Sequence, residues 1–290
     1  MRVLLFGQAV LTHHVPHVQE LLHSLKAEQF MVSVYRPYQE LLAEHMPEIS
    51  SIPAIDALSE TQIDIVITLG GDGTILKAVT LIGEREIPVL GINLGRMGFL
   101  ATIENRLLSQ AISKLARGMY SIENRTMLYL ETDREIFQGM RFALNDFTLH
   151  KRDTSSMITI HTYINGDYLT SYWADGLIVS TPTGSTGYSL SCGGPIVFPN
   201  SGNFVITPVA PHNLNVRPIV ISDTSVISFE IEGRSSSFLC TMDSRHETVT
   251  SEFQLAVRKC DFHTRLIVPD NFSFLRTIHE KLTWGKDTRN

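Results

Sequence analysis

Residues 68–79, TLGGDGTILKAV, place glycines and an acid where an expected strand gives way to an expected helix. Gly70, Gly71 and Gly73 permit a tight turn and the close approach of a ligand. In a parallel sheet, ligands bind at the carboxyl ends of the strands, and the N–H groups that open the next helix can receive phosphate oxygens. Together with Thr74, these glycines therefore predict a loop that binds the phosphates of a nucleotide donor.

The acid at the centre of this loop, Asp72, indicates phosphoryl transfer rather than phosphate binding alone. A carboxylate accepts the proton of an attacking hydroxyl, and it attracts the magnesium ion that accompanies nucleoside triphosphates. The spacing matches neither GxxxxGK[ST] nor GxGxxG, so the loop is neither a P-loop nor a dinucleotide fingerprint. A plain Asp-Gly turn is the structural alternative. Lys77, one helical turn beyond Thr74, either faces the same ligand or is a solvated helix lysine.

Two further loops carry side chains that suit a nucleotide. The segment NLGRMGFLATI (93–103) follows another expected strand, and its Arg96 is either a phosphate ligand or an exposed loop arginine. The segment LND places Asn145 and Asp146 in a β run, where adjacent side chains point to opposite faces. Both reach one ligand only if a turn or bulge bends the strand, and an Asx turn is the alternative.

The segment 173–197, WADGLIVSTPTGSTGYSLSCGGPIV, contains the densest group of candidate ligand contacts. Its central part, STPTGSTGYSLS, has too many hydroxyls and glycines for a regular strand, and these groups suit a ribose or a phosphate. Tyr188 can stack on a ring or form a hydrogen bond at one side. Asp175 can hold a ribose or an amide, unless it forms a turn or a salt bridge. A plain surface loop is the alternative, but the apolar runs on both sides favour a binding role.

The first half of the chain must place the GGDG loop at the edge of a sheet. Apolar runs alternate there with segments of helical periodicity, which predicts a parallel α/β sheet. The run IDIVITL is apolar except for Asp64 and Thr68, as expected of a strand that is buried on both faces. The predicted strands cover residues 2–6, 31–35, 63–69 and 87–93. The predicted helices cover residues 15–30, 38–46, 74–83 and 106–117.

The second half is predicted to be antiparallel β, as a sandwich or a related layered form. After about residue 125, short alternating runs are separated by Gly, Asn, Asp or Pro, and Asn165-Gly166 predicts a hairpin. The tail at 272–284 is helical again. We therefore expect an α/β domain over 1–122, joined by the tail 270–290, and a β-rich domain over 123–269.

Composition excludes several classes of protein. The 290 residues carry a net charge of -6 with a pI of about 6.0, so the whole molecule lacks the basic field of a nucleic-acid-binding protein. No run of 18 or more apolar residues is present, which argues against a membrane-spanning helix. Three cysteines without CxxC spacing argue against a disulfide framework and favour a reducing cytoplasm. The beginning of the chain is interpreted as a first strand rather than a signal sequence.

The chain resembles the NAD kinases over nearly its whole length. The resemblance depends on four motifs in the order of that family: GGDGT (70–74), NLGRMGFL (93–100), LND (144–146) and DGLIVSTPTGSTGYSLSCGGPI (175–196). Diacylglycerol and sphingosine kinases and 6-phosphofructokinases carry loops similar to the first motif, whereas the last is specific to NAD kinases. The resemblance implies an α/β amino-terminal domain of the NAD kinase/diacylglycerol kinase type and a β-rich carboxyl-terminal domain that binds NAD.

The resemblance also implies the reaction, in which ATP phosphorylates the 2′-hydroxyl of the adenosine ribose of NAD to give NADP. Magnesium would accompany ATP, no metal-ligand residue is assigned, and the protein would be a homodimer or homotetramer. Asp72 would be the base, and Gly73 would contact the nucleotide beside it. Asn145 and Asp146 would bind the second ribose and the adenine region. The remaining residues implied to contact NAD are Trp173, Asp175, Thr186, Gly187, Tyr188, Ser189, Leu190, Ser191, Ala210 and Arg245.

Two departures from the family pattern affect this assignment. Trp173 stands where several members carry a basic residue, and an aromatic side chain favours stacking over charge pairing. Gly187 replaces the usual alanine. Whether ATP or polyphosphate is the donor, and whether NADH is accepted, is not determined by these motifs.

Two rival functions make different demands on the sequence. A lipid or sugar kinase would share the GGDG loop, but the STPTGSTGYS segment suits a dinucleotide, and an amphipathic basic surface segment is lacking. A catalytically silent NAD or NADP sensor would require Asp72 to be dispensable. The NAD kinase interpretation accounts for both the acid and the hydroxyl-rich loop.

Overall fold

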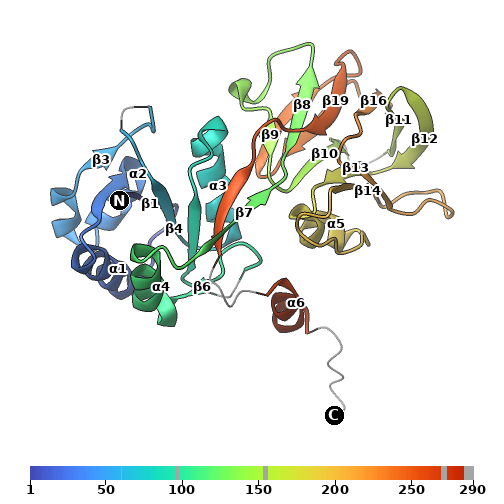
Figure 1. Ribbon diagram of the computed structural model, residues 1–290. Coiled ribbons are helices and arrows are strands. Elements are labelled where there is room, and N and C mark those ends of the chain that lie inside the picture. The colour runs from blue at the N-terminus through green and yellow to red at the C-terminus, as the bar shows by residue number, and fades with distance from the viewer. Residues whose placement is uncertain (60, 96–97, 153–155, 269–272, 284–290) are drawn as a thin grey trace. The chain divides into compact units, whose positions relative to one another are not determined.

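The computed structural model of the protein describes residues 1–59, 61–95, 98–152, 156–268 and 273–283 (Figure 1). The chain divides into two compact units. The first consists of Met1–Asn124 together with the segment that begins at Thr264, and the second consists of Arg125–His263.

The first unit contains an eight-stranded sheet in the order β3-β2-β1-β4-β5-β20-β7, with β6 paired to β5. The pairings of β1 with β2 and β4, and of β5 with β4, β6 and β20, are parallel. The strands are β1 (Arg2–Gly7), β2 (Met31–Tyr35), β3 (Ala54–Ile55), β4 (Ile65–Leu69), β5 (Val89–Asn93), β6 (Ile103–Glu104), β7 (Ser121–Arg125) and β20 (Thr264–Val268).

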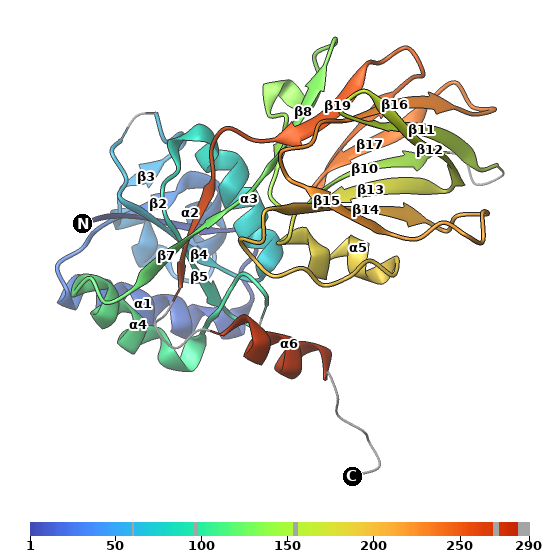
Figure 2. The same ribbon diagram turned by 45° about the vertical axis from the view of Figure 1, so that its right-hand side comes forward.

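Helices cover the two faces of this sheet. They are α1 (Val15–Ala27), α2 (Arg36–Ala43), α3 (Asp72–Ile82) and α4 (Leu108–Ala116), with short 3-10 turns at Thr12–His14, Pro47–Ser51, Gly83–Arg85 and Asn105–Leu107. The remaining helix, α6 (Phe274–Leu282), lies off the sheet, and its Phe274 packs against Phe99. The buried residues of α1, α2 and α4 share one core with alternate residues of β1, β4 and β5, and α1 lies beside α4 (Figure 2). Ile75 of α3 packs against Gly91 on the other face of β5. Every residue of β4 and β5 is buried, as a central parallel strand requires.

The predicted α/β class is confirmed for this half, and the boundaries of its elements differ by a few residues. The predicted helix 74–83 begins two residues earlier, so Asp72 lies in the first turn of α3 rather than in the loop before it. The predicted helix 15–30 ends at Ala27, because Gln29 has a positive φ and Phe30 turns back into the core. Such shifts are expected, since periodicity defines the interior of an element better than its ends.

The second unit contains two six-stranded antiparallel sheets, in the orders β15-β14-β13-β10-β17-β18 and β12-β11-β16-β19-β8-β9. The strands of the first sheet are β10 (Asp146–Lys151), β13 (Gly176–Ser180), β14 (Asn203–Val209), β15 (Ile219–Ser222), β17 (Phe238–Met242) and β18 (Arg245–Val249). The strands of the second are β8 (Leu128–Thr132), β9 (Phe142–Ala143), β11 (Ile158–Ile164), β12 (Asp167–Ala174), β16 (Ile227–Glu232) and β19 (Leu255–Lys259). The unit also has α5 (Tyr188–Ser191) and 3-10 turns at Phe137–Gly139 and Gly184–Thr186.

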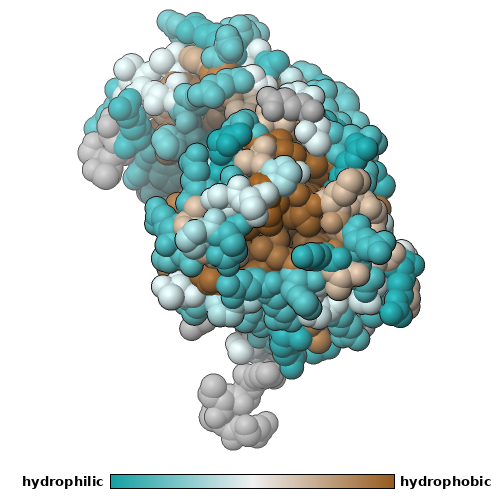
Figure 3. Space-filling model, turned by 90° about the vertical axis from the view of Figure 1, so that its left-hand side faces the viewer, coloured by the Kyte–Doolittle hydropathy of each residue, from teal (hydrophilic) through white to brown (hydrophobic). Residues whose placement is uncertain are grey.

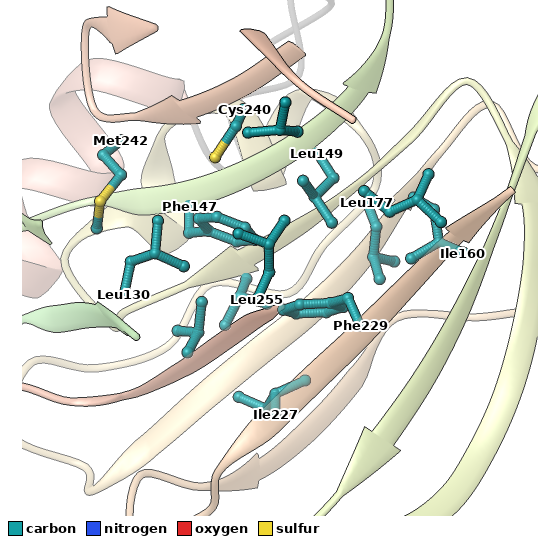
Figure 4. Packing of buried hydrophobic residues seen from close by; sticks show 14 of the residues in the cluster. Leu130, Phe147, Leu149, Ile160, Leu177, Ile227, Phe229, Cys240, Met242 and Leu255 are labelled. Atoms are coloured by element: carbon teal, nitrogen blue, oxygen red, sulfur yellow. The ribbon is translucent and has the colours of Figure 1, made fainter. Parts of the chain in front are cut away.

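The two sheets share one apolar core, so the predicted sandwich-like form is confirmed. Phe147 of β10 stacks on Phe229 of β16 with ring centroids 5.5 Å apart (Figure 4). Leu177 of the first sheet and Leu255 of the second belong to the same cluster. The hairpin predicted at Asn165-Gly166 joins β11 to β12, where Ile164 pairs with Asp167.

The division into units differs slightly from the ranges 1–122 and 123–269. Residues 264–268 were predicted to belong to the β-rich domain, but they form β20, which pairs in parallel with β5 of the first unit. The run TRLIV, which contains three apolar residues in a row, suits a strand of either sheet, so its sequence does not distinguish the two sheets.

No helix within the described ranges is both long and apolar enough to cross a membrane. The face shown in Figure 3 is hydrophilic over most of its area, around an apolar region near its centre.

Candidate active site

The GGDG loop connects the end of β4 to the start of α3. Gly71 is the N-cap of α3, and Gly70 donates its N–H to the carbonyl of Ile92 at 3.0 Å. Apart from the neighbouring backbone, no atom of the described residues lies within 4 Å of the position that a Cβ would take at Gly71 or Gly73, so the described part of the chain leaves space for a ligand at both glycines. Thr74, in contrast, is only 8% exposed, and its side chain packs beneath Gly70.

Backbone amides hold the Asp72 carboxylate. Its Oδ2 accepts the N–H of Phe99 at 2.8 Å, and its Oδ1 accepts the N–H groups of Leu100 and Ala101 at 3.0 Å each. A carboxylate has about four acceptor positions, so these bonds fix its orientation and leave about one position for a ligand. A Cβ at Gly98 would lie 1.8 Å from Oδ1, so only glycine fits beside this carboxylate.

The loop 93–103 therefore has a role that its side chains do not reveal. It was predicted to bind phosphate through Arg96, which lies outside the described residues. In the described part of the loop, the backbone N–H groups bind Asp72 instead. Lys77 is exposed on α3, and its predicted contact with a nucleotide stays a prediction.

A lysine that the sequence analysis did not predict also lies at this site. Lys281, in α6, places its Nζ 3.6 Å from Oδ2 of Asp72 and 4.6 Å from the centroid of the Phe99 ring. Asp72 and Lys281 lie far apart in the sequence, and no motif surrounds the lysine. No local signal in the sequence could have identified it.

In the second unit, the β run at LND is interrupted in the way that the prediction for Asn145 and Asp146 required. β9 ends at Ala143 and β10 begins at Asp146. Between them, the carboxylate of Asp243 accepts the N–H of Leu144 at 3.0 Å and that of Asn145 at 2.7 Å. The Oδ1 atom of Asn145 is buried and has no hydrogen-bond partner among the described residues, which excludes the Asx turn and leaves an acceptor for a ligand.

Asp243 was also missed by sequence reasoning. It lies in the tight turn between β17 and β18, where an acid has the ordinary interpretation of a turn residue. Its function becomes visible only when the fold brings that turn to the break between β9 and β10. The side chain then orders the backbone that presents Asn145 and Asp146.

Asp146 is 8% exposed and lies near a second carboxylate. Burial, together with the charge of Asp243, raises the pKa of Asp146 from its ordinary value of 3.8 to about 7. At neutral pH this side chain is therefore present both as a carboxylate, which accepts hydrogen bonds, and as a carboxylic acid, which also donates one. Both forms suit contact with a polar ring or a ribose hydroxyl.

Asp146→Asn is expected to stabilise the protein at high pH but not at low pH. In the unfolded chain Asp146 loses its proton near pH 4, whereas in the folded chain it keeps the proton until about pH 7, so the folded state of the parent loses stability as pH rises through this window. Asparagine avoids this loss, and we expect a gain of about 2–4 kcal/mol at pH 8 that vanishes by pH 4. Urea unfolding across this range measures the difference, with Asp167→Asn, an exposed acid of the same unit, as the control. A gain that is equal at pH 4 and pH 8 would contradict the argument.

In the hydroxyl-rich segment after β13, several hydroxyls form hydrogen bonds with other groups of the second unit. Thr181 donates its Oγ1 hydrogen to the carbonyl of Leu144 at 2.6 Å and accepts the N–H of Gly184 at 3.1 Å. Ser189 is fully buried, and its Oγ lies 2.8 Å from the Oγ1 of Thr207. The predicted ligand contacts here thus divide into buried supports and more exposed candidates.

The exposed candidates lie together in sequence on the turn Gly184–Thr186 and on α5. Tyr188 is 41% exposed, and Ser191 is also exposed. Thr186, Gly187 and Leu190 are partly buried. The surface of this short segment therefore presents a ring and a hydroxyl.

Trp173 and Asp175 lie at the end of β12 and directly after it. The indole of Trp173 is 45% exposed and packs against His212, with ring centroids 4.2 Å apart. Ala210, after β14, is exposed and has a positive φ. Asp175 forms an ion pair with Lys151 at 2.5 Å, so its carboxylate is partly neutralised before any ligand binds. The salt-bridge alternative for Asp175 is thus observed. This pair is made through Oδ1 of the carboxylate, so Oδ2 can still contact a ligand.

Arg245 is engaged with the protein itself. Its guanidinium donates hydrogen bonds to the carbonyls of Met140 and Phe142 and lies 5.5 Å from the centroid of the Phe142 ring. A role in NAD binding would therefore depend on the backbone that Arg245 holds, since the guanidinium is largely occupied.

A resident metal ion does not fit these side chains. Within the described ranges, no three His, Cys, Asp or Glu residues form a group that could hold an ion. Most acceptor positions of Asp72 are filled by N–H groups, and a cation already lies beside it. The described residues thus offer no cage for a divalent metal.

Both halves of the sequence match known domains. Residues 10–120 match the ATP-NAD kinase N-terminal domain, and residues 144–268 match the ATP-NAD kinase C-terminal domain. The chain is 46% identical to the NAD kinase of Cytophaga hutchinsonii over 289 residues, covering 99% of each chain. It is 41% identical to the NAD kinase of Flavobacterium psychrophilum over 294 residues, covering 100% of each.

Two solved structures share the fold. Yeast NADH kinase complexed with NADH aligns with a TM-score of 0.88 at 24% identity, covering 99% of this chain and 88% of that chain. An NAD kinase from Archaeoglobus fulgidus in complex with ATP aligns with a TM-score of 0.78 at 23% identity, covering 98% and 99%. The GGDGT motif lies within the first matched domain, and the LND and hydroxyl-rich motifs lie within the second.

Proposed function

Since this chain belongs to the NAD kinase family, we propose that Asp72 is the general base of its reaction and that the second unit contributes most contacts to NAD. The chain is a phosphotransferase that transfers a phosphoryl group from ATP to NAD and forms ADP and NADP. In the proposed step, Asp72 takes the proton of the 2′-hydroxyl of the adenosine ribose. The hydroxyl oxygen then bonds to the terminal phosphorus of ATP, and ADP leaves as its bond to that phosphorus breaks.

The observation that carries this proposal is the orientation of the Asp72 carboxylate. Three amide hydrogen bonds hold it beside two glycines that leave open space. A general base needs a fixed carboxylate with one oxygen lone pair free for the hydroxyl proton, and about one acceptor position remains. The N–H of Thr74 bonds to the carbonyl of Gly71 at 3.0 Å, so the N–H groups of Asp72 and Gly73 at the start of α3 are the candidates to receive phosphate oxygens of the donor.

The contacts to NAD are proposed from the second unit. Asn145, through its unpaired Oδ1, and Asp146 would bind the second ribose and the adenine region, and Asp175 would bind the nicotinamide end. Tyr188 and Trp173 would stack on the rings. The other residues of the segment 186–191, with Ala210, would line the dinucleotide. Ser189 would act through its bond to the Thr207 hydroxyl, and Arg245 by holding the backbone at Met140 and Phe142.

The donor is proposed to be ATP in its magnesium complex. Magnesium keeps several waters and is usually held through substrate phosphates and one or two carboxylates, so an enzyme without a dedicated cage can still use it. A homodimer or homotetramer and a cytoplasmic location also stay predictions, and sedimentation of the purified protein tests the first of these.

A coupled assay tests the proposed reaction. The purified protein, NAD, ATP and magnesium are incubated with a dehydrogenase that accepts only NADP, and reduced NADP is followed by absorbance. We expect activity with ATP that requires the divalent metal. If NAD binds but no NADP forms with ATP or polyphosphate, the protein is a sensor and the kinase proposal fails.

Gly184→Ala is expected to weaken NAD binding by about tenfold. A Cβ at Gly184 would lie 2.1 Å from the backbone carbonyl oxygen of Asn145, so the backbone of one of the two segments must shift. Because both segments are proposed to contact NAD, the shift should raise the Kd measured by calorimetry. Gly187→Ala is the matched control, since its nearest contact would be 3.2 Å, and alanine is the usual residue of the family there. Equal Kd values for the two variants would contradict the proposed site.

A further inference from the structure

The GGDG loop carries no lysine of its own, yet the fold brings one to it. Lys281 of α6 places its ammonium 3.6 Å from Oδ2 of Asp72, on the carboxylate that the amides of residues 99–101 already hold. The same ammonium lies 4.6 Å from the centroid of the Phe99 ring. The two side chains are only partly exposed, at 37% for the lysine and 27% for the aspartate, so water screens their attraction incompletely.

The position of Lys281 follows from the way in which α6 is attached. Ser273 caps the helix by accepting the N–H of Arg276, and the Phe274 ring packs against Phe99 with centroids 6.1 Å apart. Ile278 is 7% exposed. Phe274, Ile278 and Lys281 follow the spacing i, i+4, i+7, which places them on one face of a helix. The face of α6 that packs against the rest of the first unit is therefore also the face that carries Lys281.

We propose that Lys281 is a positioning residue for phosphoryl transfer, which supplies from α6 the cation that the GGDG loop lacks and holds the Asp72 carboxylate toward the acceptor hydroxyl. This inference rests on the proposed role of Asp72 as the base. The three amides that bind the carboxylate are uncharged. The Lys281 ammonium lies beside Oδ2, so Oδ2 is next to a positive charge. The cation also disfavours a divalent metal ion on the same carboxylate, since like charges repel. Asp72 is thereby reserved for the hydroxyl proton.

The test compares Lys281→Met, Lys281→Arg and Arg276→Met. Methionine preserves helix propensity and apolar cover over Phe99 but removes the charge. Arg276 lies on the same helix and pairs with Glu280 at 2.6 Å, so its replacement by methionine removes one cation at a matched site away from Asp72. Each variant is assayed for kcat and for the KM values of NAD and ATP, and its thermal unfolding is recorded to verify that α6 and the fold are retained.

We expect Lys281→Met to lower kcat by about tenfold with both KM values unchanged, as fits one partly exposed charge pair. Arginine should restore most of this loss, and Arg276→Met should leave kcat within about twofold of the parent. In the Asp72→Asn background, Lys281→Met should have no further effect, because its action passes through Asp72.

Three results would overturn the inference. A kcat for Lys281→Met equal to that of Arg276→Met would remove Lys281 from the reaction. A rise in the KM of ATP at unchanged kcat would assign the lysine to the triphosphate instead. An undiminished effect in the Asp72→Asn background would show that Lys281 does not act through Asp72. If Asp72→Asn itself keeps normal turnover, the proposed base fails, and this outcome is separate from a failure of Lys281 alone.

Discussion

Asp72→Asn is expected to lower kcat by about 10²–10⁴-fold, which is the usual contribution of a general base. Asparagine has nearly the same shape as aspartate, and its amide oxygen can still accept N–H groups from the loop 99–101. What it loses is the ability to take a proton from the ribose hydroxyl, together with the N–H bond at the oxygen that its NH2 group replaces. Because NAD is proposed to bind mainly through the second unit, the Kd of NAD should change by less than about threefold.

The measurement requires turnover and binding on the same preparations. The coupled assay gives kcat, and calorimetry gives the Kd of NAD for the parent and for Asp72→Asn. Asp56→Asn is a suitable control, since Asp56 forms an exposed ion pair with Arg36, with side chains 56% and 46% exposed, and neither residue is proposed to act in the reaction. Its kcat should equal that of the parent. Near-normal turnover of Asp72→Asn would exclude Asp72 as the base.

The fold class could be predicted because it depends on patterns that persist over many residues. The apolar run that became β4 and the helix that became α3 were visible as strand and helix, and their order placed the GGDG loop at the edge of a parallel sheet. Alternation and the Asn165-Gly166 turn likewise indicated antiparallel sheets. In contrast, β20 was assigned to the other unit, because an apolar run does not specify its partner strand.

The candidate site could be predicted only as far as residue types reveal chemistry. Asp72 and Asn145 stood out because an acid in a glycine loop and an Asn-Asp pair within a β run are unusual. Their partners did not stand out. The donors to Asp72 are backbone N–H groups, which every residue except proline carries, and Asp243 and Lys281 come from distant segments.

In the hydroxyl-rich loop, the sequence showed the candidate residues but not which groups they bind. Its Ser and Thr residues were all visible, but a hydroxyl bonds equally well to a ligand or to the protein's own backbone. In the folded chain Thr181 and Ser189 are fully buried and bonded within the unit, whereas Tyr188 is exposed. Composition can therefore identify a binding loop without distinguishing its ligand contacts from its internal supports.

Gly98→Ala should lower kcat by about 10²-fold, although the variant retains every side chain proposed to act in the reaction. A Cβ at this position would lie 1.8 Å from Oδ1 and 2.6 Å from Cγ of Asp72, a separation that no packed pair of atoms adopts. The carboxylate must rotate away, and it then loses N–H donors at Phe99, Leu100 and Ala101. A displacement of about 1 Å at a reacting group costs on the order of 10²-fold in rate.

Gly95→Ala is the control for this variant, because it adds the same methyl group to the same loop. Among the described residues outside its chain neighbours, the atom nearest to its Cβ would be Oδ1 of Asn93 at 3.9 Å, which is ordinary contact, and kcat should stay within about twofold of the parent. The unpaired N–H groups in Gly98→Ala should also lower stability by about 1–3 kcal/mol, so thermal unfolding must show that the assayed protein is folded.

The decisive comparison joins Gly98→Ala to Asp72→Asn. If the methyl group acts by displacing the base, it should add little to the loss once the base is absent, and the double variant should resemble Asp72→Asn alone. If the two losses multiply, then Gly98 contributes through another route, such as the approach of the donor. Normal turnover of Gly98→Ala would mean that the amides of this loop do not orient a catalytic carboxylate, whatever the fate of Asp72 itself.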